Sequence, residues 1–303
     1  MKMVDNCITL EQIKKSASSL RVLRPAYKEF IDFYEEFFIA QEEAKTQINL
    51  DAIAEELDNQ LKLKTDNTTP LISTLDFVIF QSQAEVLFEK ICKIAKEKGS
   101  PSLSSAAEKI SQLFFINSST SQSCNQIESY KRIDNIFKAL LYNDHKILET
   151  TAKSLELNKD ALIFLGFAAI SPYIQTYSTQ LSKYIKTEDS YTKGSCPICS
   201  GSPQMGYFNQ NGDKYLICSF CQHRWKTSRM GCSLCGNREK GKQHYFFNEE
   251  EKEYRVDLCD NCRKYIKVID LREITRDFYP PLEMLCTIHL NMQAAEQGYI
   301  SVL

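Results

Sequence analysis

Long hydrophobic runs are missing from the chain. The longest, residues 161–170, is interrupted by Gly166 and followed by Ser171-Pro172, whereas a membrane-spanning helix needs about 20 apolar residues. The first residues, Met-Lys-Met-Val-Asp, also lack the apolar segment of a secretory leader. These absences predict no membrane span, a buried helix over residues 161–170, and a cytoplasmic location.

The motifs of common enzyme classes and a charge excess are also missing. We find no glycine-rich phosphate loop, no G-x-S-x-G and no H-E-x-x-H. The 37 Lys and Arg and 39 Asp and Glu leave a net charge of −2, without the basic excess that phosphate binding requires. We therefore expect neither an enzyme with its own active site nor a nucleic-acid-binding protein.

Cysteine is abundant, and its spacing indicates metal binding. Eight of the 12 cysteines form four Cys-x-x-Cys pairs: Cys196/Cys199, Cys218/Cys221, Cys232/Cys235 and Cys259/Cys262. Two such pairs complete one tetrahedral four-sulfur site, so four pairs predict two metal ions. A disulfide framework belongs to short secreted chains, which this one does not resemble. Cys7, Cys92, Cys124 and Cys286 are isolated and are assigned no chemistry.

The order of the pairs predicts how they combine. A turn at Asn211-Gly212 lies between aromatic and aliphatic runs, and a polar turn at residues 248–251 repeats the pattern, so each half reads as pair, hairpin, pair. This is the order of a rubredoxin-like or zinc-ribbon unit. It predicts one site from Cys196, Cys199, Cys218 and Cys221 and another from Cys232, Cys235, Cys259 and Cys262. Interleaved pairing stays open because only ten residues separate Cys221 from Cys232.

The residues around the pairs carry further expectations. A left-handed glycine after the second cysteine lets backbone N–H groups face sulfur; Gly236 and Gly201 occupy such places, while the pairs ending at Cys221 and Cys262 lack one. His223 could suggest a Cys/His nucleophile, but we expect it beside a metal ligand. Residues 196–272 hold 13 Lys and Arg against 9 Asp and Glu, an excess that two sites of charge −2 would cancel. Lys264, Lys267 and Arg272 are expected on a solvated face.

The first 190 residues show helical periodicity. Aromatic residues recur at three- and four-residue steps over residues 27–38, and similar patterns cover residues 77–95, 124–142, 144–155 and 158–169, with Asn158 as an N-cap. Residues 186–195 read as a linker. We predict an α+β multidomain chain: an all-α helical domain over residues 1–190, then two tandem rubredoxin-like or zinc-ribbon modules over residues 191–231 and 232–303, the second ending in a C-terminal helix.

The cysteine-rich half resembles a known family. Cys196-Pro-Ile-Cys199-Ser-Gly-Ser-Pro, Tyr-Leu-Ile-Cys218-Ser-Phe-Cys221 with Trp225 and Arg229, Cys232-Ser-Leu-Cys235, Asp-Leu-Cys259-Asp-Asn-Cys262 and Glu-Gln-Gly-Tyr299 are similar to the formate dehydrogenase accessory (formation) proteins. The resemblance covers residues 196–299. Many members carry a longer polar tail than this chain shows.

The resemblance implies a cytoplasmic, non-catalytic assembly factor. It would bind the catalytic subunit of formate dehydrogenase, hold two iron ions, and be needed for that enzyme's activity. Zinc fits the same four-cysteine sites, and the chain is compatible with a homodimer. Trp225 and Arg229 are candidate partner contacts, with packing between the two sites as the alternative. A small redox protein with four-cysteine iron sites and a nucleic-acid-binding zinc ribbon remain alternative functions.

Overall fold

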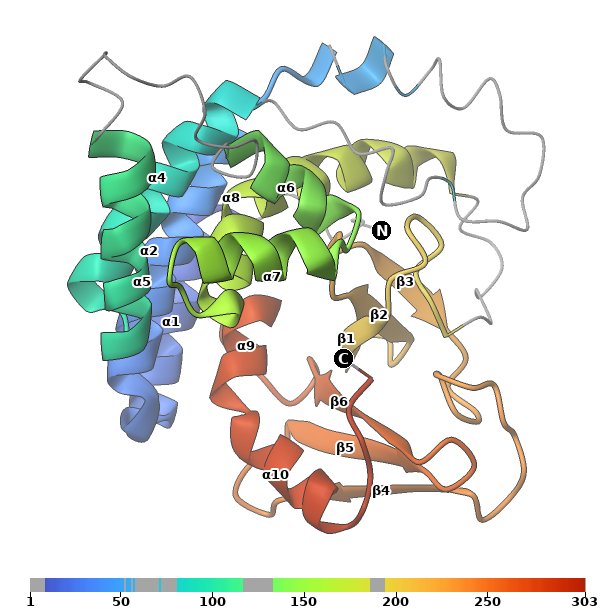
Figure 1. The fold of residues 1–303 in the computed structure, drawn as a ribbon. Coiled ribbons are helices and arrows are strands. Elements are labelled where there is room, and N and C mark those ends of the chain that lie inside the picture. Colours follow the sequence, from blue (N-terminus) through green and yellow to red (C-terminus); the bar gives the residue numbers. More distant parts are fainter. Residues whose placement is uncertain are drawn as a thin grey trace. The chain divides into compact units, whose positions relative to one another are not determined.

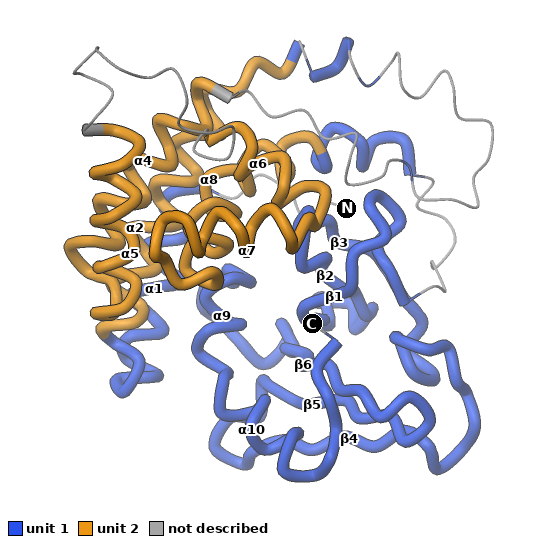
Figure 2. Tube along the Cα trace, viewed as in Figure 1, with its two compact units in different colours: residues 1–28, 51–73, 178–303 blue, residues 29–50, 74–177 orange. Residues whose placement is uncertain are grey.

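The chain folds into two compact units, one helical and one built around a sheet (Figure 2). The computed structural model describes residues 9–51, 53–55, 57, 71, 81–116, 133–185 and 194–302. The helical unit comprises residues 29–50 and 74–177, and the sheet unit residues 1–28, 51–73 and 178–303. The first helix therefore belongs with the sheet, whereas the domain boundaries expected at residues 190 and 231 stay a prediction.

Most helices of the helical unit form where apolar periodicity predicted them, whereas the helices over residues 101–116 were not predicted. Its helices are α2 (Lys28–Lys45), α4 (Gln81–Lys98), α5 (Pro101–Ser111), the π-helix η3 (Gln112–Ile116), α6 (Ile133–Leu141), α7 (His145–Ser154) and α8 (Lys159–Leu181) (Figure 1). The last residues of α8, from Ser178, and the short η6 (Ser182–Tyr184) that follows belong to the sheet unit. Phe37 of α2 stacks on Phe164 of α8 with ring centroids 5.3 Å apart. The Gln41 amide donates to the Ala168 carbonyl at 2.7 Å. The prediction that the aromatic residues at helical spacing form core is therefore confirmed in part, since Phe37 is buried whereas Phe30 is 38% exposed.

Helix boundaries follow the capping signals, with one exception. The Asn158 side chain accepts hydrogen bonds from the N–H groups of Asp160 and Ala161, as an N-cap does. The expected stop at Ser171-Pro172 was wrong, because α8 continues through Pro172 to Leu181. The residues around Pro172 are buried in the unit, so packing offsets the lost backbone hydrogen bond. The expected linker and the starts of two predicted helices, residues 77–80 and 124–132, lie outside the described residues, except for Gly194 and Ser195.

One helix, residues 159–184, is long and apolar enough to cross a membrane by composition alone, but 72% of its most apolar window is buried inside the protein. Core helices of soluble proteins pass the same test. No other helix among the described residues is long and apolar enough to pass it.

The sheet unit holds six strands in a single sheet of order β3-β2-β1-β6-β5-β4. The strands are β1 (Pro203–Phe208), β2 (Lys214–Cys218), β3 (Arg224–Thr227), β4 (Gln243–Phe247), β5 (Tyr254–Cys259) and β6 (Lys264–Asp270). Each half of the cysteine-rich region forms three antiparallel strands, and β1 pairs with β6 in parallel. The hairpin turns occur where they were expected. The third strand of each half and the joining of both halves into one sheet were not predicted.

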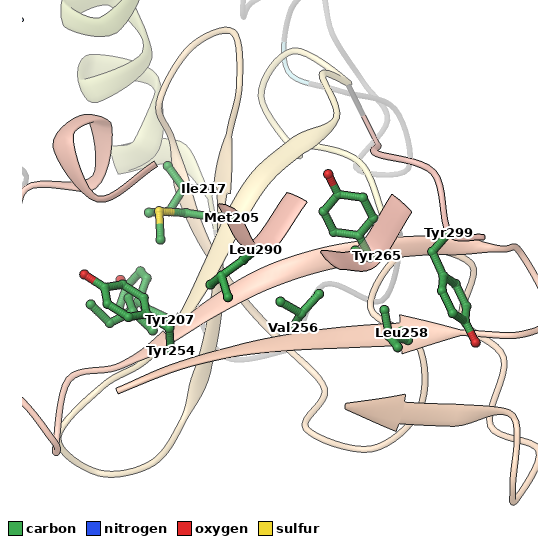
Figure 3. Close-up of a cluster of buried hydrophobic side chains, with 11 residues drawn as sticks. Met205, Tyr207, Ile217, Tyr254, Val256, Leu258, Tyr265, Leu290 and Tyr299 are labelled. Atoms are coloured by element: carbon green, nitrogen blue, oxygen red, sulfur yellow. The ribbon is translucent and has the colours of Figure 1, made fainter. Parts of the chain in front are cut away.

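Among the described residues, the sheet shares this unit with α1 (Leu10–Leu23), which is followed by η1 (Pro25–Tyr27), and with the C-terminal α9 (Pro280–Cys286) and α10 (Ile288–Glu296). Two short helices thus replace the single expected C-terminal helix. The helical residues 51, 53–55 and 57, the end of α8 and η6 also belong to this unit. Leu290 and Ala294 of α10 pack with Val256 and Leu258 of β5 in the core cluster drawn in Figure 3. Arg24, at the end of α1, forms an ion pair with Glu251 before β5. The sheet is therefore held by its own core and by helices from both ends of the chain.

Candidate metal centres

The eight paired cysteines gather into two groups of four. Cys196, Cys199, Cys218 and Cys221 form the first site, and Cys232, Cys235, Cys259 and Cys262 form the second; within each, the sulfur atoms lie within 4.8 Å of one another. In both sites one pair precedes a hairpin and the other follows it, since Cys218 ends β2 and Cys259 ends β5. The grouping is the sequential one, and the interleaved alternative does not occur.

The spacing of the sulfur atoms fits a tetrahedral ion. In the first site Sγ–Sγ distances are 3.6 Å for Cys196–Cys221 and 3.5 Å for Cys199–Cys218. In the second they are 3.9 Å for Cys232–Cys262 and 3.8 Å for Cys235–Cys259. Four sulfurs at about 2.3 Å from a central ion are about 3.8 Å apart. Both groups could therefore hold a metal ion without rearrangement.

Left-handed backbone follows the second cysteine of every pair. Ser200, Gln222, Gly236 and Arg263 have φ of 62°, 58°, 75° and 57°. Only one of these is glycine, and a non-glycine residue in this region costs about 1–2 kcal/mol. Gly236 was correctly placed, whereas Gly201 is not left-handed. The pairs ending at Cys221 and Cys262 adopt the same turn without a glycine. The shared geometry at such a cost indicates that holding the sulfurs together determines the turn.

Gly201 has a different role from the one predicted. A Cβ at this position would lie 2.9 Å from the Cys218 sulfur and 3.3 Å from the Cys199 sulfur. Such a contact is too short for carbon and sulfur. Glycine is therefore required at residue 201 because two ligands of the first site pass directly over it.

Hydrogen bonds to sulfur favour thiolates. The N–H groups of Phe220 and Cys221 point to the Cys218 sulfur at 3.4 and 3.5 Å. Hydrogen bonds from the neighbouring thiols of Cys196, Cys199 and Cys221 hold the pKa of Cys218 far below its usual range, while burial raises the pKa of Cys196. One buried thiolate thus suppresses ionisation of its neighbours. A cation is needed for all four sulfurs to be deprotonated together.

The two sites differ in exposure. All four cysteines of the first site are buried, with relative exposures of 0% to 5%. In the second site Cys235 is exposed, and only Cys259 is buried. Burial raises the pKa of the Cys235 thiol, but hydrogen bonds from the Asn237 backbone, the Asn261 side chain and the Cys232 and Cys262 thiols together lower it, to about 7. The first site is closed to solvent, and the second is open on the side of Cys235.

Of the two residues predicted to contact a partner, Trp225 is buried and Arg229 is exposed. Trp225 of β3 is buried and stacks on His223 at 6.4 Å between ring centroids, and burial lowers the pKa of His223 to about 4. Arg229 is exposed, and its guanidinium lies over the Phe208 ring at 5.7 Å. The geometry brings Trp225 into the packing of the first half. The partner role of Trp225 and Arg229 stays a prediction.

Two features were missed or misread in the sequence. Lys267 was expected on a solvated face but is 3% exposed, and its ammonium donates to the carbonyls of Met284 and Thr287 at 3.1 and 3.2 Å. Nothing in the sequence around Lys267 indicated that this lysine is buried. The Tyr299 hydroxyl bonds to Asp260, directly after Cys259. This contact joins the Gly298-Tyr299 sequence near the end to the fourth cysteine pair.

Comparisons with known proteins place the chain beside proteins named FdhE. No protein family model matches it. An FdhE homolog of Aquifex aeolicus is 30% identical over 164 residues, which are 52% of this chain and 56% of that protein. One of Haemophilus influenzae Rd is 26% identical over 148 residues, or 47% of each chain. The chain thus spans about half the length of the curated relatives it matches.

The fold extends the likeness beyond the region aligned with those relatives. The crystal structure of the FdhE protein from Pseudomonas aeruginosa matches with a TM-score of 0.62 and 19% identity, over 98% of this chain and 95% of that one. At this identity the match concerns the fold alone. Together with the curated relatives, it supports the family of formate dehydrogenase accessory proteins that the cysteine motifs predicted.

Proposed function

We propose that this chain, as a member of the formate dehydrogenase accessory protein family, assists the maturation of formate dehydrogenase by binding its catalytic subunit in the cytoplasm. Two observations together support the proposal: the sheet unit holds two four-cysteine sites, and the relatives of the chain are named FdhE. In this role the chain does not oxidise formate itself. It supplies a binding surface for an enzyme that is still being assembled.

The chemistry of the sites supports a role in holding the surface in shape. A bound divalent ion would offset half of the negative charge of four thiolates and fix both turns of each half. We propose iron as the ion, as the family resemblance implies, with zinc as the alternative. Metal analysis of the protein purified without oxygen distinguishes them, and ferric thiolate sites absorb visible light whereas zinc sites do not.

The buried ionisable groups elsewhere in the sheet unit serve packing. Glu283 of α9 is fully buried and accepts hydrogen bonds from Tyr254 and Arg276. Arg276 also donates to the Tyr254 hydroxyl at 2.8 Å. These three side chains satisfy one another and join α9 to β5. This network therefore suits a structural role in a binding protein better than proton transfer.

A redox carrier is the second candidate, favoured by the exposure of Cys235. An electron-transfer site needs a ligand near the surface, and iron with four thiolates changes oxidation state readily. A reversible one-electron potential in the purified iron form would favour this candidate. A protein that is fully functional with zinc alone would exclude it.

The maturation proposal is tested by deleting the gene in its host and growing the cells under anaerobic conditions. We expect formate dehydrogenase activity to be lost while other molybdenum enzymes keep theirs, and the wild-type gene to restore it. Purified chain and catalytic subunit should also bind each other directly. Activity that survives the deletion, or failure of the two purified proteins to bind, would contradict the proposal.

A further inference from the structure

A pocket of about 430 Å³ lies beside the second site, lined by residues of β4, β5 and β6, by Lys214 of β2 and by residues 229–234. Its lining includes Arg229, Met230, Tyr245 and Arg255. Met230 is 78% exposed and Tyr245 60% exposed. Exposed methionine and aromatic side chains beside arginine are typical of protein contacts. We call this region, together with the free side of β4, the edge pocket.

The free side of β4 offers unpaired backbone. This strand is the last in the sheet order, and the Asp260 N–H donates to the Lys242 carbonyl just before it. Along an antiparallel strand, successive residues direct their N–H and C=O groups alternately toward the paired strand and away from it. Lys242, His244 and Phe246 therefore direct their backbone groups to β5. Gln243, Tyr245 and Phe247 direct theirs outward, where no backbone partner is found among the residues that the structure describes.

Nothing in the composition of β4 protects this edge. Edge strands commonly carry lysine or proline that discourages pairing with another chain. Here the strand reads Gln-His-Tyr-Phe-Phe. Tyr245 and Phe247 stack at 6.4 Å between ring centroids, and Phe247 is 46% exposed. An edge strand with exposed aromatic side chains and no lysine or proline of its own, although Lys242 directly precedes it, suits an extended segment that adds one strand to the sheet.

The charge of the pocket selects an acidic segment. Four Lys or Arg side chains line it against one carboxylate, Asp257. Asp257 is already shared, because Lys214 reaches it at 2.7 Å and Arg255 at 2.8 Å. A metal-loaded second site would add two negative charges, and the pocket would still be positive. Arg229 has no ion pair within the described part of the chain and stands at the exposed rim.

A second copy of this chain is a poorer occupant. Two copies that pair through the same edge would form a two-fold contact. Such a contact would bring the positive pockets of both copies together, and like charges face each other at a cost. An acidic, partly apolar segment meets no such repulsion.

We propose that the edge pocket binds an extended acidic segment of the partner, which pairs with the free side of β4 and directs a carboxylate to Arg229. Resting on the proposed function, the partner is the catalytic subunit of formate dehydrogenase. The apolar side chains of the segment cover Tyr245 and Met230. The second site holds Cys232 and Cys259 beside the pocket and so keeps its walls in place.

The test measures binding of purified catalytic subunit to the metal-loaded full chain, by calorimetry at low and physiological salt. Arg229→Glu should weaken binding at least roughly tenfold, Arg229→Lys should restore most of it, and the affinity of the parent chain should fall with salt. Lys240→Glu is the control, since Lys240 is exposed and does not line the pocket. Metal content of two ions per chain checks that each variant is folded.

A second pair of variants tests strand pairing. Tyr245→Pro removes the outward N–H without touching the hydrogen bonds to β5, whereas Tyr245→Ala removes only the ring. The proline variant should bind more weakly than the alanine variant. If the parent chain binds and Arg229→Glu and Tyr245→Pro bind equally well, the edge pocket is not the site, while the proposed function stands.

Two other outcomes also overturn the edge-pocket proposal. If the parent chain does not bind the subunit at all, the proposed function fails and this inference fails with it. If sedimentation shows a dimer of the parent chain that Tyr245→Pro converts to monomer, with subunit binding retained, the occupant of the edge is a second copy.

Discussion

Replacing Cys218 with alanine should unfold the first half of the sheet and leave the helical unit intact. Cys218 is fully buried, ends β2, and its sulfur accepts two backbone N–H groups. Without it, the first site has three thiolates, and the left-handed turns at Ser200 and Gln222 lose the ion that holds them. Strands β1, β2 and β3 all depend on these turns.

The expected size of the effect exceeds the stability of the sheet. A structural four-ligand zinc site supplies about 10–16 kcal/mol of apparent binding free energy, whereas a whole domain is stable by only about 5–15 kcal/mol. A site that loses one of four ligands keeps a fraction of that free energy. The strands it organises should therefore melt, rather than lose a few degrees of thermal stability.

The chain contains a built-in probe for this prediction. Trp225 is the only tryptophan and is 4% exposed in β3, after the turn that holds Cys221. Its fluorescence should shift to the red in Cys218→Ala, while most of the helical circular dichroism remains. Cys92→Ala is the control, because Cys92 is buried in α4 of the helical unit and belongs to neither group of four. Two metal ions per chain in Cys218→Ala, with unshifted tryptophan emission, would refute the reasoning.

Three further predictions concern individual residues. Gly201→Ala should weaken metal retention in the first site, because its Cβ would meet two sulfurs. Gly236→Ala, which has open space around its Cβ but a φ of 75°, should lose about 1–2 kcal/mol of folding stability and keep the metal. Competition with a chelator compares metal retention in the two variants. Burial lowers the pKa of Lys267 to about 8, so this side chain binds more protons in the unfolded chain between pH 8 and 10.5, and its contribution to stability should rise across that window by roughly 3 kcal/mol. Because burial raises the pKa of thiols such as Cys286, which act in the opposite direction, the rise is measured in urea unfolding as the stability of the parent chain relative to Lys267→Met. Alkylation should modify Cys235 first and release one ion before the Trp225 emission changes; simultaneous loss of both ions would contradict the difference in exposure.

The sites were predictable because their signal is local. Two cysteines separated by two residues can meet one ion from a single turn, and the hairpins at Asn211-Gly212 and residues 248–251 bring the second pair back to the first. Both depend on neighbours in the chain. The choice of sequential pairing follows from the same short connections. The backbone after each pair was only half predicted, since Ser200, Gln222 and Arg263 adopt a conformation that glycine merely makes cheaper.

The rest depends on contacts between distant segments. The parallel pairing of β1 with β6 has no counterpart in spacing or periodicity. It joins the two halves and, with α9 and α10, helps to determine which surfaces are covered. Lys267 was misread for that reason: a lysine in β6 looks solvated until the carbonyls at the end of α9 are placed over it. The continuation of α8 through Pro172 likewise reflects burial, which local helix propensity does not report.

The two halves of the sheet follow each other by translation, in the order β3-β2-β1 then β6-β5-β4. A two-fold arrangement would have joined equivalent strands and left equivalent strands at both ends. Translation joins the first strand of one half to the third strand of the other, so the ends are unlike: β3 carries the buried Trp225, and β4 carries the exposed Tyr245. An internal repeat of this kind has a direction. The β4 end presents exposed side chains, whereas the β3 end places its tryptophan in the interior, although both halves carry the same pattern of cysteine pairs.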